Sequence, residues 1–129
     1  MKWIALTLIA GIAACDTDET LRSYGAADKT WVLTEIDGTA FTARTTMTFP
    51  EKGRIAGKAP CNSYGGTMSV PYPWFKVGPL RSTKMACSEL QAETRFFRAL
   101  SDMSLSEVAG DTLILSTPEG RQMIFKAGE

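Results

Sequence analysis

Short stretches in which apolar and polar residues alternate recur along most of the chain, and turn-forming residues separate them. This period of two is typical of β-strands with one buried face. Asp37-Gly38 and residues 50–53 end the first two stretches, and Gly110-Asp111 separates two near the carboxyl terminus. We therefore expect a hairpin over 45–57 and a carboxyl-terminal antiparallel meander. The segments predicted to form strands are 31–36, 45–49, 54–57, 64–70, 74–77, 104–108, 112–115 and 122–125.

Between residues 89 and 101 the period changes to that of an amphipathic α-helix. Ser88, with Gln91 three residues later, resembles a capping box at its start. Many strands and one helix predict an α+β domain, in which the helix covers a strongly curved antiparallel sheet of about eight strands. The apolar face of the helix is expected to carry Leu90, Phe97 and Leu100, with Phe96 and Met103 beside them. The face exposed to solvent is expected to carry Glu93, Arg95 and Arg98.

The beginning of the chain has another pattern. Lys2 precedes a run, residues 4–14, that is apolar except for Thr7. The run is shorter than the roughly 20 residues that a bilayer-spanning helix needs. It has no polar face, and acidic residues follow it at once, so a buried helix of the domain is disfavoured. The pattern predicts a secretory signal peptide over residues 1–14.

The signal ends in a motif that resembles the bacterial lipobox: Ile12-Ala13-Ala14-Cys15. The resemblance implies that the Cys15 thiol receives diacylglycerol, that the chain is cut before it, and that the new amino group is acylated, for example with palmitate. Several acyl chains together hold a protein firmly to a membrane. Residues 15–29 are polar without a period, which predicts a lipidated tether before a domain over 30–129. We expect a lipid-anchored protein of the bacterial cell envelope that faces the periplasm, on the inner or the outer membrane.

Composition narrows the function classes. The chain has 129 residues, enough for one domain, and its 14 basic and 14 acidic side chains cancel. No basic stripe is present for a nucleic-acid backbone, so no nucleic-acid partner is expected. Histidine, the commonest general base and a frequent metal ligand, is absent from the sequence. We therefore expect no catalytic residues, no metal and no cofactor.

The chain has two cysteines, Cys61 and Cys87, in addition to the lipidation residue Cys15. The exported compartment is oxidising, which favours a disulfide between them. Closing this loop would restrict the unfolded chain by about 3.5 kcal/mol in the chain-entropy model. A pair of buried free thiols is the alternative, and geometry alone could enforce it. A metal site is disfavoured, since two cysteines without histidine do not complete a tetrahedral site.

Several short motifs follow one another along residues 30–126. They consist of Trp31, Leu33, Phe49, Gly53, Arg54, Gly57, Cys61, Asn62, Gly65, Ser82, Thr83, Met85, Ala86, Cys87, Glu93, Phe96, Leu100, Gly110, Asp111, Thr112, Leu113 and Phe125. In this order they resemble the META domain family, which includes the HslJ-like heat-shock lipoproteins. The resemblance implies a barrel-like antiparallel sheet around one helix and no established enzymatic activity. The family usually has glycine where this chain has Pro60, a difference that affects the geometry of the loop entering Cys61.

The first functional hypothesis is a non-enzymatic envelope protein in envelope integrity or stress tolerance, which contacts an unknown envelope protein or cell-wall component. Tyr72, Trp74 and Phe75 are the candidate contact residues, with packing in the core as the alternative. The second hypothesis is an inhibitor or ligand-binding module acting on a periplasmic partner, for which the loop 71–76 is the candidate. A hydrolase with a Ser82–Lys84 pair is the third, disfavoured by the missing histidine. Asn62 is expected to hydrogen-bond the backbone of its own loop.

Overall fold

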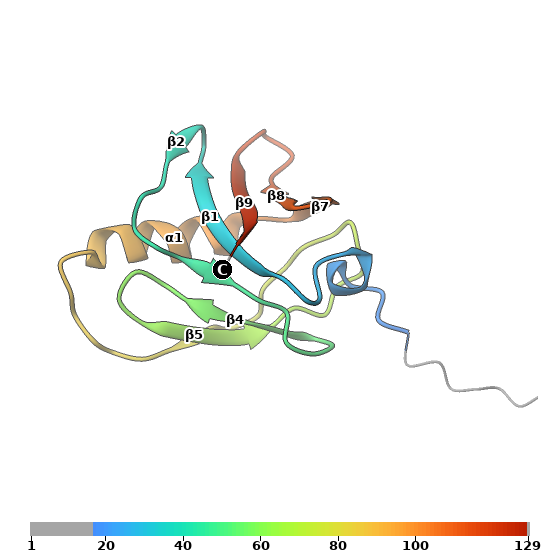
Figure 1. Ribbon diagram of the computed structural model, residues 1–129, viewed down its shortest axis with the longest axis horizontal. Coiled ribbons are helices and arrows are strands. Elements are labelled where there is room, and N and C mark those ends of the chain that lie inside the picture. The colour runs from blue at the N-terminus through green and yellow to red at the C-terminus, as the bar shows by residue number, and fades with distance from the viewer. Residues whose placement is uncertain (1–16, 129) are drawn as a thin grey trace, which may run out of the picture.

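The computed structural model describes residues 17–128 as two antiparallel β-sheets and one α-helix (Figure 1). The α+β class expected from the sequence is confirmed. In chain order the elements are η1 (Leu21–Tyr24), β1 (Thr30–Ile36), β2 (Thr39–Ala40), β3 (Thr46–Met47), β4 (Arg54–Lys58), β5 (Ser63–Thr67), β6 (Arg81–Ser82), α1 (Leu90–Asp102), β7 (Leu105–Ala109), β8 (Thr112–Ser116) and β9 (Gln122–Gly128).

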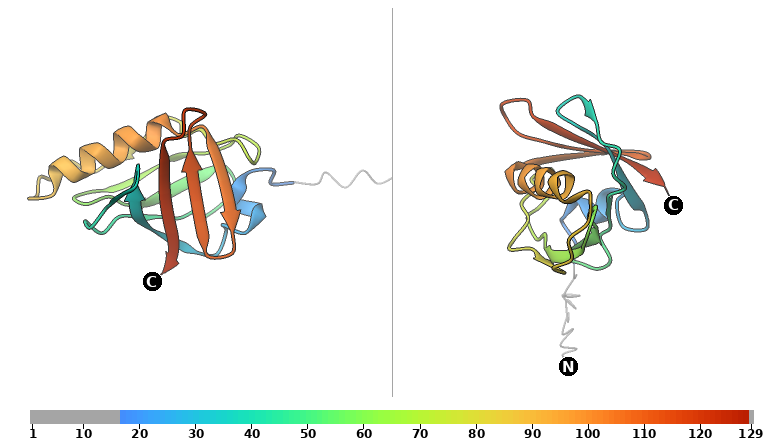
Figure 2. Two further views of the ribbon diagram at one scale, coloured as in Figure 1. Left: turned by 90° about the horizontal axis from the view of Figure 1, so that it is seen from above. Right: turned by 90° about the vertical axis from the view of Figure 1, so that its left-hand side faces the viewer.

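The larger sheet has six strands in the order β2-β1-β9-β8-β7, with β3 also paired to β1. The smaller sheet has the order β4-β5-β6. One isolated bridge, between Thr48 and Ala56, connects the strand β3 region with β4. Within residues 17–128 neither sheet closes into a barrel, so the barrel-like closure expected from the resemblance is not found. In Figure 2 (right) helix α1, seen nearly end-on, lies between strands β8 and β9 and the smaller sheet.

The carboxyl-terminal meander is confirmed, because β7 pairs with β8 and β8 with β9, each antiparallel. The hairpin expected over 45–57 is reduced to the Thr48–Ala56 bridge, since β3 pairs with β1 and β4 with β5. No strand forms over 74–77, where only Trp74 bridges to Leu105. The nearby Pro71 lacks the N–H that a strand ladder uses, and so does Pro73. Strands β2 and β6, of two residues each, were not predicted.

Helix α1 begins at Leu90 and ends at Asp102, close to the predicted span, but its buried face is rotated from the predicted one. Leu90 is 45% exposed, and Glu93, expected in solvent, is 5% exposed. The capping box is not formed, because the cap position is Glu89 and no side chain bonds the helix start there. The residues that α1 buries are Glu93, Phe96, Ala99 and Leu100.

The segment expected to be a tether, residues 15–29, is in large part folded onto the domain. Leu21 and Ala26 are fully buried in the core. Arg22 Nε donates to the carbonyl oxygen of Phe49 at 2.9 Å, and the Tyr72 N–H donates to that of Glu19 at 2.7 Å. Burial of these two apolar side chains, together with hydrogen bonds made by the backbone beside them, holds a mainly polar segment on the core. The domain therefore begins before residue 30.

The leader, residues 1–14, and the lipidation residue Cys15 lie outside the described residues, and their predictions stay predictions. Among residues 17–128, no helix is long and apolar enough to cross a membrane.

Candidate functional site

A disulfide bond joins Cys61 to Cys87, with their Cα atoms 5.6 Å apart, so the bridge predicted from the sequence is present. Cys61 lies in the turn between β4 and β5, and Cys87 lies just before α1. The bond therefore ties the smaller sheet to the start of the helix. Cys87 is exposed to solvent and Cys61 is half-buried.

A hydrogen-bond network around Glu93 reinforces this connection. Glu93 Oε1 accepts the backbone N–H groups of Cys61, at 3.0 Å, and Asn62, at 2.8 Å. Glu93 Oε2 accepts from Asn62 Nδ2 at 2.7 Å. Glu93 lies in the first turn of α1, where the helix dipole favours a negative charge. Burial of this side chain is therefore compensated by three N–H donors from one turn.

Asn62 is 5% exposed, and its side chain uses its full bonding capacity. Its Oδ1 accepts from Thr83 Oγ1, at 2.8 Å, and from the Met85 N–H, at 2.7 Å. Its Nδ2 donates to the Met85 carbonyl oxygen at 2.9 Å as well as to Glu93. Asn62 is thus structural, as expected, but it holds the segment 83–85 rather than its own loop. We call Glu93, Asn62, Thr83 and Met85 the Glu93 network.

A hollow of about 370 Å³ lies over the Glu93 network and is also lined by Leu90 and Phe97. The polar atoms of Asn62 and Glu93 are engaged by protein donors and acceptors, so they have little capacity left to bind a ligand. Ser82, from β6, and Lys84 line the same hollow. The network therefore acts as a structural connection between the helix and the sheet.

The three aromatic residues predicted as a contact site divide between core and surface. Phe75 is 2% exposed and belongs to the core, so for this residue the packing alternative holds. Trp74 is 58% exposed, whereas Tyr72 is half-buried. Tyr24, which the sequence analysis did not single out, is 55% exposed and stacks on Tyr72 with ring centroids 4.5 Å apart. We call Tyr24, Tyr72 and Trp74 the aromatic edge.

Backbone hydrogen bonds fix the loop that carries the aromatic edge. The Phe75 N–H donates to the Ser104 carbonyl oxygen at 2.9 Å, and the Ser106 N–H donates to that of Pro73 at 2.7 Å. The Val108 N–H donates to the Tyr72 hydroxyl at 3.2 Å. The loop 71–76 therefore lies along β7 and η1 instead of protruding, and Figures 1 and 2 show it beside η1.

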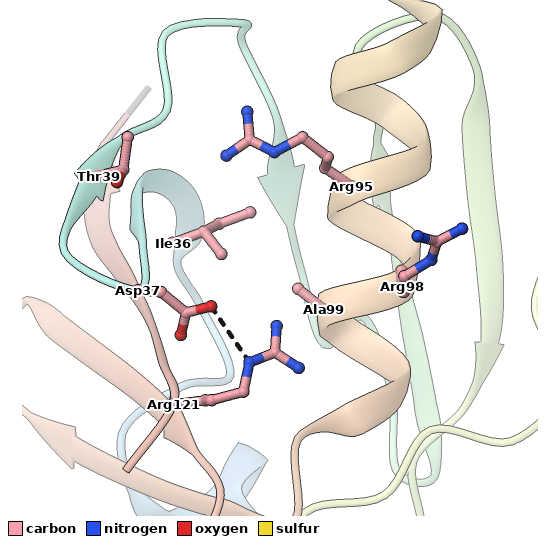
Figure 3. Close-up of a pocket in the computed structure, with 7 residues that line it drawn as sticks. All are labelled: Ile36, Asp37, Thr39, Arg95, Arg98, Ala99 and Arg121. Carbon is pink, nitrogen blue, oxygen red and sulfur yellow. Dashed lines mark hydrogen bonds and ion pairs between the residues drawn. The ribbon is translucent and has the colours of Figure 1, made fainter.

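A second surface feature is a cleft of about 220 Å³ between α1 and the turns that follow β1 and β8 (Figure 3). Arg95 projects toward the cleft from the helix, and Arg121 lies on the opposite side with Ile36 between them. Arg98 turns away in the same view. Arg121 pairs with Asp37 at 3.1 Å and with Asp102 at 2.6 Å.

Electrostatics in this cleft follow from these pairs. A hydrogen bond from the Gln122 backbone N–H holds the pKa of Asp37 below its usual value, and Arg121 adds to the effect. Hydrogen bonds to Asp102 and Asp37 raise the pKa of Arg121. Asp37 has φ of 50° and precedes Gly38 with φ of 79°, as the predicted turn after β1 requires. The turn thus positions a carboxylate for Arg121.

Four carboxylates that could have met in space do not form a common site. Of Glu35, Glu89, Glu93 and Glu107, only Glu93 is buried, and the Glu93 network engages it. Across residues 17–128, no group of three or more cysteine, aspartate or glutamate side chains is arranged to hold a metal ion.

The chain is similar to known proteins in sequence pattern and in fold. The family model described as META domain matches residues 25–129. A protein from Burkholderia xenovorans, solved by NMR, superposes with a TM-score of 0.66 at 23% identity, covering 84% of this chain and 86% of that one. The crystal structure of a DUF4847 family protein from Bacteroides vulgatus superposes with a TM-score of 0.66 at 13% identity, covering 84% and 97%. At these identities the two structures support the fold alone.

A comparison with curated proteins finds no significant match. The family match covers most of the chain, begins at Gly25 beside the folded amino-terminal segment, and includes the disulfide, the Glu93 network and the meander. The chain belongs to the META domain family.

Proposed function

We propose that the protein is a non-enzymatic, lipid-anchored component of the bacterial cell envelope that faces the periplasm. The observation that carries this proposal is the apolar leader that ends in Ile12-Ala13-Ala14-Cys15, close before the start of the folded domain. The Cys61–Cys87 disulfide supports it, because such bonds persist in exported proteins and are rare in the cytosol.

The protein acts through contact with other envelope components and not by turnover of a substrate. The polar network around Glu93 is engaged in holding the fold together. The exposed Trp74 is of the residue type that dominates binding surfaces. Its physiological role is envelope integrity or stress tolerance, as the family resemblance suggests.

Intact-mass analysis of the full-length chain expressed in a bacterium tests the anchor. The expected product begins at Cys15 and carries the mass of a diacylglycerol group and an additional acyl chain. Cys15→Ser should abolish the added mass. The Cys61→Ser/Cys87→Ser variant is the matched control, since it removes the other two thiols and should still carry the lipid. An uncleaved chain without acyl groups refutes the proposal.

The role in the envelope is tested by complementation. A strain without the gene should be more sensitive to a detergent or to heat, and the wild-type chain should restore tolerance. Cys15→Ser should restore less, because it lacks the anchor. Equal rescue by the two forms would show that the role does not depend on anchoring.

The cleft in Figure 3 favours a second candidate function, that of a ligand-binding module. Its volume of about 220 Å³ is below the usual range for drug-sized ligands, about 300–1,000 Å³, and suits a small anionic group. Arg95 would supply the guanidinium group that binds a carboxylate or phosphate, because Arg121 is already paired with Asp37 and Asp102. Calorimetric titration with inorganic phosphate tests this, and Arg95→Gln should weaken any binding while Arg54→Gln, outside the cleft, should not. Absence of binding at millimolar phosphate refutes it.

A further inference from the structure

The aromatic edge lies beside the point where the chain joins the domain. The Tyr72 N–H donates to the carbonyl oxygen of Glu19, and Tyr24 stacks on Tyr72. The Asp18 carbonyl oxygen accepts from Ser23 Oγ, which fixes the chain from residue 18 onward. Two of the most exposed large apolar side chains, Tyr24 and Trp74, are thus gathered where the folded part of the chain begins.

Covalent geometry limits how far this region can be from Cys15. Glu19 follows Cys15 by four positions, so their Cα atoms are at most about 14 Å apart in any conformation. A lipidated Cys15 lies at the surface of the hydrocarbon core, and the headgroup layer above it is roughly 5–8 Å thick. With that anchor, Glu19 and the Tyr72 backbone bonded to it would lie in the headgroup layer or a few ångströms above it.

Tryptophan and tyrosine are the side chains that prefer this layer, because each has an apolar ring and a polar group. We propose that the aromatic edge docks into the headgroup layer of the membrane that carries the anchor, and so fixes the orientation of the domain. This inference rests on the lipid anchor proposed above. The occupant of the aromatic edge is the phospholipid surface itself.

Charge at the aromatic edge does not favour anionic lipid over neutral lipid. Asp18 forms an ion pair with Arg22 at 3.8 Å, and Glu19 and Lys76, which adjoin the edge in sequence, carry opposite charges. Docking should therefore occur on phosphatidylcholine, without anionic lipid, and should change little with salt. This distinguishes insertion of the rings from attraction to a charged surface.

Fluorescence quenching by brominated lipid tests the orientation. The mature chain would contain two tryptophans, the fully buried Trp31 and the exposed Trp74. Lipidated protein reconstituted in phosphatidylcholine vesicles, brominated near the headgroups, should lose about half of its emission, because only Trp74 reaches the quencher. Trp74→Phe should abolish this loss, and its fold should persist because the side chain is exposed.

A matched control moves the reporter to the other end of the domain. Met85 is 63% exposed and lines a hollow with Leu90, the first residue of α1. Figure 2 (left) shows the start of α1 far from η1. Tryptophan introduced by Met85→Trp in the Trp74→Phe background should remain unquenched.

The outcomes separate this inference from the proposed function. A lipidated protein whose Trp74 is not quenched, or whose Met85→Trp reporter is quenched equally, overturns the orientation and leaves the anchor standing. A protein whose intact mass shows no acyl groups overturns both. A Trp74 that crosslinks to a protein in intact cells while remaining unquenched by lipid would assign the aromatic edge to a protein partner instead.

Discussion

Replacing the buried Glu93 by alanine should markedly lower the free energy of unfolding. The substitution leaves three N–H donors without an acceptor: the backbone groups of Cys61 and Asn62, and Asn62 Nδ2. Asn62 is 5% exposed, so water does not readily replace the carboxylate there. Cys61 is half-buried, and its N–H can recover a water partner.

The magnitude follows from these contacts. A buried donor left unsatisfied costs about 1–3 kcal/mol. Two fully buried donors and one partly solvated donor give a loss of about 3–5 kcal/mol for Glu93→Ala. Total stability of a small domain is about 5–15 kcal/mol, so this loss is a large fraction of it.

Glu93→Gln is the matched control. Its amide oxygen can still accept the two backbone N–H groups, but its NH₂ group then faces the NH₂ group of Asn62. Asn62 cannot reverse its amide without losing its bonds to Thr83 and Met85. The Asn62 donor is left unsatisfied, whereas the glutamine NH₂ group borders the hollow and can reach water there, so the expected loss is about 1–3 kcal/mol.

Urea denaturation at neutral pH, followed by circular dichroism, measures both variants against wild type. The expected order of stability is wild type, Glu93→Gln, Glu93→Ala, with unchanged slopes. A loss below about 1 kcal/mol for Glu93→Ala would refute the reasoning, because it would mean that the donors find other partners at little cost.

Three further predictions concern other parts of the fold. Gly57→Ala should lower the free energy of unfolding by about 3 kcal/mol in urea denaturation, because the added Cβ would lie 2.0 Å from a backbone carbonyl oxygen of β3. Gly65→Ala is the control and should be neutral, because its Cβ would lie 3.6 Å from the nearest atom, a backbone oxygen. Asp37→Asn should be less stable than wild type at pH 7, and melting curves recorded well below pH 4 should show no difference between the two. The pKa of Asp37 is lower in the folded than in the unfolded chain. The carboxylate therefore stabilises the fold above its pKa in the unfolded chain, about 4, and this contribution is lost as the pH falls through its pKa in the folded chain. Replacing Cys61 and Cys87 together by serine should cost about 3.5 kcal/mol in urea denaturation. Reduction of wild type should reproduce that loss, and a loss under about 1 kcal/mol would contradict the loop-entropy account.

The carboxyl-terminal half of the fold could be predicted because its signals are local. Gly110 closes a turn between two alternating segments, and each strand pairs with its neighbour in sequence. Strands β2 and β6 carry no such signal. They consist of two residues each and exist only because the edges of β1 and β5 are within reach. Closure of a sheet into a barrel likewise depends on contacts between distant parts of the chain. The family resemblance implied a barrel-like sheet, whereas the strands form two separate open sheets.

The burial of Glu93 could not be predicted from helical periodicity, which assigns a charged residue to the solvent face. Its partners, Cys61 and Asn62, are about thirty positions away, and only the folded chain brings their N–H groups to the helix. A signal was nevertheless present in the family resemblance. The resemblance groups Glu93 with Phe96 and Leu100, which are both buried, and this grouping was the signal that Glu93 lies on the buried face.

The position at which the folded domain begins determines how far the domain can lie from an anchor at Cys15. A tether over residues 15–29 would let the domain move as far as about 50 Å from its anchor, toward the cell wall. Burial of Leu21 and the bond between Tyr72 and Glu19 shorten that reach to about 14 Å. With the proposed anchor at Cys15, the start of the folded domain would stay close to the membrane surface. A partner would then have to come within about one domain diameter of the membrane, and surfaces other than the aromatic edge would be the ones free to receive it.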